Sequence, residues 1–336
     1  MLFPITVWYA AGVAVRNLLF AIGILKSEQP KVPTIGIGNL RVGGTGKTPH
    51  TEYIIRLLTG RRTALLSRGY GRRTKGYVLA DEENRSAAIL GDEPSMMARK
   101  FPDITVAVCE ERTEGVKRLM ESKLPPEIIV LDDVYQHRKI TPSLNILLTE
   151  YADPYSNDWI LPFGNLRESR RGSRRANIVV VTKCPATVAD KEQAAIRKQL
   201  KLREDQKLFF SHIEYSTPVA LYSTPMPERI EQVLLVTGIA RPEPLVAHLE
   251  KHYKVSHLRF PDHHRFSSDD CRRIVDAFNA LPSDSKAVIT TEKDAMRLLG
   301  DEVRNVLGDL PVFYVPITVV FQNGKAFDKT IYDFLP

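Results

Sequence analysis

The chain has 336 residues, which is enough for two hydrophobic cores of ordinary domain size. Its composition, 43% hydrophobic and 26% charged, is typical of a globular protein, and its net charge of +7 favours an anionic partner such as nucleic acid, a nucleotide or an acidic membrane face. Three scattered cysteines without a C-x-x-C pair indicate a reduced, cytosolic compartment and argue against a zinc site: Cys109, Cys184 and Cys271.

Residues 2–25 form a strongly apolar segment that Arg16 and Asn17 interrupt. The run is therefore shorter than the ~20 clean residues that a spanning helix needs, and the lack of a preceding basic residue argues against a secretory signal. On a helix, the polar and small residues fall near one narrow face, and bulky apolar residues cover the others. We expect such a helix to lie in a membrane interface, with Trp8, Tyr9 and Arg16 at headgroup level. A helix buried on the protein's own core is the alternative.

Residues 36–49 read G-I-G-N-L-R-V-G-G-T-G-K-T-P and stand between an apolar strand pattern and a helical pattern at 53–58. Glycines without Cβ let successive backbone N–H groups turn toward one point, and the helix behind them adds the positive end of its dipole, so this segment is a candidate phosphate loop. Lys47 is expected to reach the outer phosphates, and the Thr48 hydroxyl to hold Mg²⁺. Arg41 replaces the first glycine of the strict G-x-x-x-x-G-K-[ST] pattern, and a plain glycine turn with a solvated lysine is the alternative.

Residues 63–67 are predicted to form a short strand that enters a basic glycine loop at 68–76, which suits phosphate or headgroup contact but fits a solvated loop equally well. The motif G-D-E-P at 91–94 then opens a helix at 95–101. The local pattern favours Asp92 as the N-cap of this helix, with the proline in its first turn. The alternative for this aspartate is a general base at a cleft.

The apolar run 128–131 ends in Asp132 and Asp133. In open α/β sheets, ligands bind at the carboxyl ends of buried parallel strands. With a phosphate loop upstream, this strand is expected to deliver the acid that holds Mg²⁺, directly or through water. A purely structural strand is the alternative.

The remaining regular elements expected in this half are strands at 104–108, 144–148 and 177–183 and helices at 112–121 and within 190–206. The strand at 177–183 lacks the aspartate of an N-K-x-D guanine reader, which favours ATP as the nucleotide. The densest positive patch of the chain consists of five arginines: Arg167, Arg170, Arg171, Arg174 and Arg175. Because no aromatic residue is interleaved, a phosphorylated or membrane-bound anion fits this patch better than single-stranded nucleic acid, with a solvated face as the alternative.

After a strand at 208–213, the proline-bearing stretch 216–227 is predicted to be a linker into a second α/β series. Its expected elements are strands at 233–236, 255–260 and 287–290 and helices that end near 250, follow a cap at 267–270 and follow 291–294. The loop with Asp262, His263 and His264 is the second place where chemistry is expected, because a histidine beside a carboxylate accepts a proton near neutral pH. Metal ligation and plain hydrogen-bonded loop histidines are the alternatives.

Together these segments resemble the tetraacyldisaccharide 4'-kinase family, the lipid A 4'-kinases. The matching motifs occur in family order from about residue 33 to residue 297: V-G-G-T-G-K-T-P, S-R-G-Y-G, G-D-E-P, L-D-D-V-Y-Q-H-R, L-P-F-G-N-L-R-E, V-T-G-I-A-R-P, F-P-D-H-H-R-F and T-E-K-D-A. Each motif alone is of modest specificity, whereas the ordered set is highly specific. Val134-Tyr135 departs from the Gly-Phe expected there, a change of packing more than of chemistry.

The resemblance implies ATP-dependent phosphoryl transfer to the 4'-hydroxyl of an acylated glucosamine disaccharide 1-phosphate at the cytoplasmic face of the bacterial inner membrane. It implies nucleotide binding by Arg41, Val42, Gly43, Gly44, Thr45, Gly46, Lys47 and Thr48 and Mg²⁺ binding by Thr48, Asp132 and Asp133. It also implies that Asp92 and His263, with Asp262 beside the histidine, activate the hydroxyl, which reverses the local preference for Asp92 as a cap. The residues expected to bind the acceptor are Gln136, His137, Asn165, Arg167 and Glu168.

We therefore expect a membrane-interface helix at 1–26, a three-layer α/β/α P-loop kinase domain at 27–215 and a smaller α/β/α domain at 216–336. The resemblance joins the two domains by a thin strand linker, with the site in the cleft between them. ATP and Mg²⁺ are the expected cofactors, the lipid acceptor and the membrane surface are the expected partners, no nucleic acid is expected, and the chain is expected to be a monomer. Two alternatives are a membrane-bound kinase of another acceptor and a nucleotide-dependent switch, although such switches usually carry a lysine where this chain has Val42.

Overall fold

The computed structural model describes residues 3–224, 227, 229–262 and 264–335, and this part of the chain forms two compact units. The first unit comprises Met1–Ile213 and Val319–Pro336, and the second comprises Glu214–Thr318. The expected boundary at residue 216 lies close to the observed one. The C-terminal segment, however, belongs with the first unit and not with the second.

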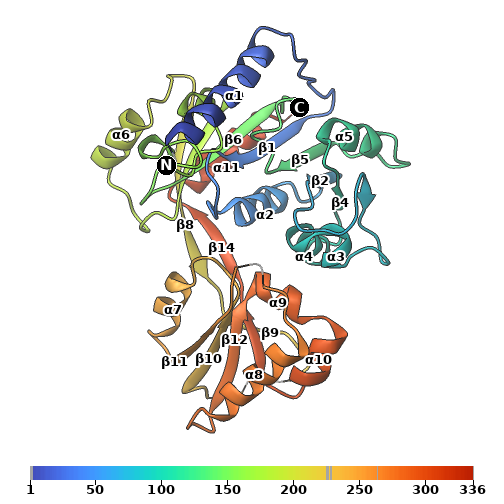
Figure 1. Ribbon diagram of the computed structural model, residues 1–336, viewed down its shortest axis with the longest axis vertical. Coiled ribbons are helices and arrows are strands. Elements are labelled where there is room, and N and C mark those ends of the chain that lie inside the picture. Colours follow the sequence, from blue (N-terminus) through green and yellow to red (C-terminus); the bar gives the residue numbers. More distant parts are fainter. Residues whose placement is uncertain (1–2, 225–226, 228, 263, 336) are drawn as a thin grey trace. The chain divides into compact units, whose positions relative to one another are not determined.

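Among the described residues of the first unit, nine strands form one sheet in the order β14-β8-β7-β6-β1-β5-β2-β4-β3 (Figure 1). The strands are β1 Thr34–Asn39, β2 Thr63–Ser67, β3 Val78–Leu79, β4 Thr105–Val108, β5 Ile128–Asp132, β6 Leu144–Glu150, β7 Ile178–Thr182, β8 Lys207–Tyr215 and β14 Ile317–Phe321. β1 pairs in parallel with β5 and β6, and β2 and β7 continue the parallel pairing on either side. These central strands are apolar runs buried along most of their length, as a covered parallel sheet requires.

Helices flank this sheet, and their packing forms the core of the first unit. They are α1 Phe3–Ala21, α2 Lys47–Leu57, α3 Ala87–Leu90, α4 Asp92–Lys100, α5 Arg112–Met120, α6 Asp190–Gln199 and α11 Gly324–Tyr332, with 3-10 turns at Tyr155–Asn157 and Arg170–Arg175. Leu119 of α5 packs on Leu66 and Leu131 of the sheet, and α2 packs against β1 and β5. This arrangement agrees with the α/β architecture expected from the sequence.

The C-terminal segment joins the first unit through aromatic packing. β14 lies beside β8 at the edge of the sheet. Phe321 stacks on Phe327 of α11 with ring centroids 3.9 Å apart, and both rings lie against Tyr53 of α2. The Tyr53 hydroxyl donates a hydrogen bond to Asp328 at 2.7 Å across 275 positions of sequence. Contacts at such a separation leave no local periodic pattern, so the expected domain assignment of 216–336 missed this return of the chain.

In the described part of the second unit, five strands form a sheet in the order β11-β10-β12-β13-β9 (Figure 1). The elements are β9 Val219–Ala220, β10 Gln232–Thr237, α7 Glu243–Leu249, β11 Lys254–Arg259, α8 Ser268–Asn279, β12 Lys286–Thr291, α9 Glu292–Leu298, α10 Asp301–Leu307 and β13 Val312–Val315. The cap expected at 267–270 is a reciprocal capping box between Ser267 and Asp270. β9 lies within the stretch expected to be a linker and pairs antiparallel with β13.

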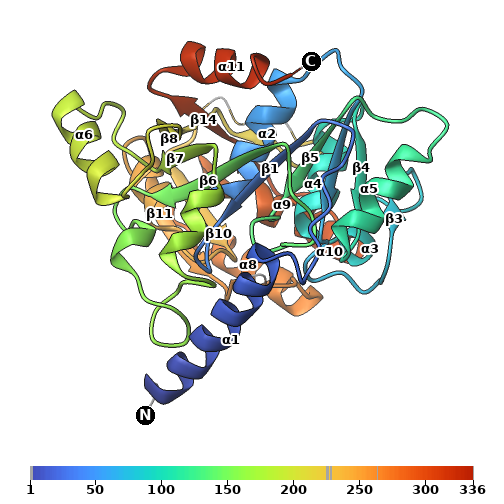
Figure 2. The same ribbon diagram turned by 90° about the horizontal axis from the view of Figure 1, so that it is seen from above.

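Helix α1 lies on the first unit by its polar side. The Tyr9 hydroxyl donates to the backbone oxygen of Arg167 at 3.1 Å, and Arg16 donates to the backbone oxygen of Gln136 at 2.9 Å. Its N-terminal end projects beyond the sheet (Figure 2). Apolar side chains that are more than half exposed, in or just after α1, are Ile5, Val7, Trp8, Val15, Leu18, Ile22 and Ile24. The alternative of a helix buried in the protein's own core is therefore wrong. None of the helices in the described part of the chain has the length and apolar character that crossing a bilayer requires.

Candidate functional site

The predicted phosphate loop joins the end of β1 to the start of α2. Gly43 and Gly46 have φ angles of +106° and +88°, a region that favours glycine. A Cβ added to Gly43 would meet no other atom within 4 Å, so the outer side of the loop is open there. The inner side is braced, because Asn39 Nδ2 donates to the Thr45 hydroxyl at 2.8 Å and the Thr182 hydroxyl donates to the Thr45 backbone oxygen at 3.0 Å. A loop that is tied inward and open outward at a helix N-terminus has the form of an anion cradle.

Arg41, which stands where the strict pattern has glycine, is buried between two carboxylates. Its guanidinium lies 2.5 Å from Asp153 and 2.7 Å from Asp158. The next residue, Val42, donates its backbone N–H to the backbone oxygen of Asn165 at 2.9 Å. Arg41 therefore fixes the start of the loop to the segment 153–165, and its charge is neutralised there.

Lys47, Asp133 and Arg167 form a charged cluster where α2 begins and β5 has just ended. Lys47 Nζ lies 3.7 Å from Asp133 Oδ1, and Arg167 Nη1 lies 3.2 Å from both oxygens of the same carboxylate. Asp133 has φ of +44°, an uncommon conformation for a residue other than glycine, and such strain collects at functional sites. Burial by itself raises the pKa of Asp133, but the charges of Lys47 and Arg167 outweigh it and hold this pKa below its usual value.

Asp132 is buried at the end of β5 and accepts two long hydrogen bonds. Its carboxylate accepts from the hydroxyls of Thr51 and Ser67, each at 3.4 Å. Burial, and then the negative charges of Glu93 and Asp133, raise the pKa of Asp132 to about 7. The charges of Lys47 and Arg112 do not fully offset these effects, so a divalent cation bound beside this buried carboxylate would be stabilised.

The donor set at this edge fits Mg²⁺. Asp132 and Asp133 offer carboxylate oxygens, and Thr48 follows Lys47 at the start of α2 with a hydroxyl. Mg²⁺ prefers such hard oxygen donors and usually retains water and substrate phosphate oxygens as ligands. Among the residues that the structure describes, no three histidine, cysteine, aspartate or glutamate side chains form a metal cage.

Several polar residues of the site were not predicted individually, although one signal would have found them. Asn39, Ser67 and Thr182 are the last residues of β1, β2 and β7, as the predicted Asp132 is of β5. Parallel pairing brings these carboxyl ends to the same edge of the sheet. Arg112, the first residue of α5, is fully buried at this edge and donates to the backbone oxygen of Asp132 at 3.2 Å. Polar residues at the carboxyl ends of buried strands therefore mark this edge of the sheet in addition to the phosphate-loop motif.

Asp92 is the first residue of α4, and Gly91 with φ of +90° takes the cap position. The local interpretation of Asp92 as an N-cap is therefore wrong by one residue. A Cβ on Gly91 would lie 2.7 Å from the backbone oxygen of Tyr70, so the basic glycine loop and the start of α4 lie against each other. Because the charge of Glu93 acts on Asp132, this helix start belongs to the same region of the first unit as the phosphate loop.

Four of the five residues expected to bind the acceptor have side-chain partners, and one of these, Arg167, pairs with Asp133 as described above. Gln136 Nε2 donates to the backbone oxygen of Asn39 at 2.7 Å, and the buried Glu168 accepts from Arg175 at 2.7 Å. His137 Nε2 lies 2.5 Å from the backbone oxygen of Glu110, and burial lowers its pKa. Asn165 is exposed, whereas Arg167 is half-buried beside Asp133, so Asn165 offers the most accessible side chain of the set.

The five-arginine patch is not one free positive surface. Arg170 donates to the backbone oxygen of Asp158 at 2.9 Å and lies over the ring of Trp159. Arg175 lies over Tyr135 and pairs with Glu168, and Arg167 pairs with Asp133. The remaining two, Arg171 and Arg174, are exposed. The patch therefore combines a structural set of arginines with a smaller solvent-facing pair.

The second unit carries the loop in which Asp262 and His263 were predicted to act. Asp262 lies exposed in a turn, and His263 lies outside the described residues. His264 Nε2 lies 2.9 Å from Asp270 Oδ2, so this histidine is tied to the capping box of α8. The roles of Asp262 and His263, and their pairing with Asp92, stay predictions.

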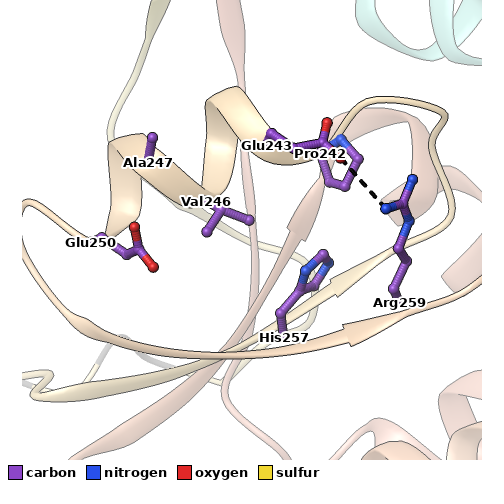
Figure 3. Close-up of a pocket in the computed structure, with 7 residues that line it drawn as sticks. All are labelled: Pro242, Glu243, Val246, Ala247, Glu250, His257 and Arg259. Carbon is purple, nitrogen blue, oxygen red and sulfur yellow. Dashed lines mark hydrogen bonds and ion pairs between the residues drawn. The ribbon is translucent and has the colours of Figure 1, made fainter.

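Each unit has a hollow among its described residues. In the second unit a hollow of about 270 Å³ lies between α7 and β11, lined by Val246, His257 and Arg259 among others (Figure 3). Two of its polar side chains already have partners, since Arg259 donates to the backbone oxygen of Ala240 and His257 bonds the hydroxyl of Thr237. In the first unit a hollow of about 760 Å³ lies beside the end of α1, and its lining residues are Arg16, Phe20, Leu25, Lys26, Ser27, Glu28, Glu111, Thr113, His137 and Lys139.

Comparison with known proteins identifies the family. A family model described as tetraacyldisaccharide-1-P 4'-kinase matches residues 1–335. Proteins named tetraacyldisaccharide 4'-kinase are 46% identical in Flavobacterium johnsoniae, with 100% of this chain and 96% of the relative covered, and 45% identical in Parabacteroides distasonis, with 98% and 93% covered. The crystal structure of LpxK from Aquifex aeolicus in complex with ATP has a TM-score of 0.75 and 29% identity, over 99% of this chain and 98% of that one, which confirms the expected fold class. The chain therefore belongs to the tetraacyldisaccharide 4'-kinase family.

Proposed function

We propose that this chain transfers the terminal phosphoryl group of ATP to the 4'-hydroxyl of a tetraacylated glucosamine disaccharide 1-phosphate, in the biosynthesis of lipid A. The observation that carries the proposal is the cluster of Lys47, Asp133 and Arg167 at the carboxyl edge of the parallel sheet, next to an open glycine loop. Phosphoryl transfer needs positioning and neutralisation of charge more than covalent help, and this cluster supplies both.

On the nucleotide side, residues 41–48 would hold the phosphates. The exposed glycines let the ligand approach the backbone closely, and Lys47 would exchange its 3.7 Å contact with Asp133 for a phosphate oxygen. Thr48, Asp132 and Asp133 would hold Mg²⁺, which when bound neutralises charge on the phosphates. The raised pKa of Asp132 supports this role, because a nearby divalent charge stabilises the ionised carboxylate.

On the acceptor side, a sugar hydroxyl becomes a good nucleophile only when its proton has an acceptor. We assign that role to Asp92 and His263 together, with Asp262 beside the histidine. Asp92 is the first residue of α4. The residue before it, Gly91, lies against the glycine loop at Tyr70, and the charge of the residue after it, Glu93, acts on Asp132. Asn165, Arg167, Gln136, His137 and Glu168 would contact the disaccharide or orient the residues that do.

The proposed acceptor is a lipid, and helix α1 of the first unit exposes apolar side chains that suit a membrane interface. Helix α1 directs Trp8 and other apolar side chains to solvent. Its polar side donates hydrogen bonds to the backbone of Arg167 and Gln136, two of the residues expected to bind the lipid acceptor. The hollow beside α1 combines apolar Phe20 and Leu25 with charged side chains of both signs, which suits an amphiphile. We therefore place the protein as a monomer on the cytoplasmic face of the inner membrane, held in the interface by α1.

The decisive experiment combines the purified chain, ATP, Mg²⁺ and a lipid A disaccharide 1-phosphate in detergent micelles. We expect ADP release that depends on the lipid, and a lipid product heavier by one phosphate at the 4' position. A nucleotide-dependent switch would instead hydrolyse ATP slowly without the lipid. Lipid-independent ATP consumption with no mass shift would overturn the proposal.

A further inference from the structure

His50 in α2 is buried between the phosphate loop and strand β8. Its Nδ1 lies 2.7 Å from the backbone oxygen of Gly46, and its Nε2 lies 2.9 Å from the hydroxyl of Ser211. The residue is 4% exposed, and its ring meets Phe321 edge-on with centroids 5.8 Å apart. Both ring nitrogens therefore have hydrogen-bond partners, although His50 is not among the residues expected to bind the nucleotide.

The chemistry of the two partners fixes the form of the imidazole. A backbone carbonyl only accepts hydrogen bonds, so Nδ1 must carry the proton that points at Gly46. Nε2 of the neutral ring is then the acceptor, and the Ser211 hydroxyl donates to it. With one nitrogen donating and the other accepting inside a buried site, the ring is held in a single hydrogen-bonding arrangement.

The carbonyl of Gly46 is a sensitive point of the loop. Gly46 caps α2 in a left-handed conformation, and its carbonyl also accepts the backbone N–H of His50 at 3.2 Å. In a planar trans peptide the C=O and the following N–H point in opposite directions. A carbonyl held inside the first turn therefore directs the N–H of Lys47 out of the helix end, toward the place where a phosphate would bind.

We propose that His50 is a positioning residue that holds the peptide between Gly46 and Lys47 in its phosphate-binding orientation and anchors it to β8 through Ser211. The inference rests on the proposed nucleotide site. β8 Lys207–Tyr215 runs past the division between the two units after Ile213, so the anchor ties the phosphate loop to a strand that both units share.

Matched substitutions separate the two hydrogen bonds. His50→Asn places an amide near the position of Nδ1 and keeps a donor for Gly46, whereas His50→Gln places its amide near Nε2 and keeps a partner for Ser211 only. His50→Phe fills the ring volume without either bond, and Ser211→Ala removes only the anchor. The measurements are ADP binding by titration calorimetry, the KM for ATP, kcat, the KM for the lipid acceptor, and the thermal unfolding midpoint without nucleotide.

We expect His50→Asn to bind ADP within about twofold of the unaltered chain. His50→Gln and His50→Phe are expected to bind about three- to tenfold more weakly, the span of one lost hydrogen bond, with the KM for ATP raised and the KM for the acceptor unchanged. The ADP affinity of Ser211→Ala is expected to lie between that of His50→Asn and that of His50→Phe.

Equal weakening in the asparagine and glutamine variants would overturn the inference, because the ring volume and not the bond to Gly46 would then matter. Unchanged binding in all four variants would overturn it as well. A folded, unaltered chain that binds no ADP at all would instead overturn the proposed function, so the two failures are distinguishable.

Discussion

Arg41 lies 2.7 Å from Asp158, and this buried ion pair occupies the point where the phosphate-loop pattern calls for glycine. The substitution does not obstruct the loop, because the guanidinium faces Asp153 and Asp158 and the open glycines follow it in sequence. The departure from the strict pattern is thus a structural device that fastens the loop to its neighbour.

Arg41→Ala should destabilise the first unit by about 3 kcal/mol, because it leaves the buried carboxylate of Asp158 without its cation. Asp158→Asn should cost a similar amount, because it removes the buried carboxylate that pairs with the Arg41 guanidinium. The matched control is Asp153→Asn, since Asp153 is 44% exposed and its pairing is weakened by water, so its loss should cost less than about 1 kcal/mol. Urea unfolding measures all three, and equal costs for the two aspartates would contradict this account.

Lys47→Ala and Asp133→Ala should each lower kcat/KM by about 10²- to 10³-fold, the usual effect of removing one group that stabilises developing charge. Neither change should unfold the chain. Lys47→Met removes the charge but keeps most of the apolar length of the side chain, so it serves as a control for lost packing. Steady-state kinetics with ATP and the lipid acceptor decide, and full activity in either alanine variant would remove the residue from the site.

Asp92→Asn should lower kcat by about 10²- to 10⁴-fold, the span associated with a positioned acid or base. His263→Ala should behave similarly, and the double variant should be little worse than either single one, because residues that act as a unit lose their effect together. Asp92 also begins α4, so the variant should lose up to about 1 kcal/mol of stability from the helix dipole. A lower unfolding midpoint with normal kcat at saturation would reduce Asp92 to that structural role.

The second unit should lose stability in acid through Asp270. Burial by itself raises the pKa of Asp270, but hydrogen bonds from the backbone and hydroxyl of Ser267 and from His264 outweigh it and hold the pKa at about 2. This value is below the usual 3.8, so the unfolded chain binds the proton more readily. The stabilisation, about 2 kcal/mol, is complete above pH 3.8 and lost as the pH falls toward 2.

The check is chemical denaturation of the unaltered chain and of Asp270→Asn at several pH values. The two stability curves should differ at pH 6 and converge as the pH approaches 2. Arg273, which lies 3.5 Å from the same carboxylate, keeps its charge throughout and does not contribute to the slope. Parallel curves over the whole range would show that the carboxylate of Asp270 has an ordinary pKa.

The central elements followed from sequence because local patterns specify them. β5 and β7 are apolar runs that end in one polar residue, and the phosphate loop between β1 and α2 carries Gly43 and Gly46 at positions that need positive φ. The braces of that loop did not follow. Thr182 and Ser211 reach it from strands far along the chain, and only the parallel sheet order brings them there.

The same reason explains the errors of the sequence analysis. The segment after 319 returns to the first unit through Phe321 and Phe327, and no pattern within that segment shows which sheet it joins. The sequence analysis treated the five arginines as one positive patch, because their spacing does not show that Arg175 pairs with the buried Glu168. Local periodicity specifies elements, whereas partners at long range depend on how the elements pack.

Helix α1 should bind membranes through the face that carries Trp8 and Val15, which lie seven residues apart on one side of the helix and are 79% and 56% exposed. Replacing both by serine should weaken binding to anionic phospholipid vesicles about 100-fold, because roughly 3 kcal/mol of apolar burial is lost. The stability in solution should not change, since these side chains contact water in the folded chain. Tyr9→Phe is the control, because it removes the bond to Arg167 and leaves the apolar face intact. Vesicle co-sedimentation gives the affinity, and the KM for ATP should stay constant while activity on vesicle-borne acceptor falls. Unchanged sedimentation of the serine variant would exclude α1 as the membrane contact.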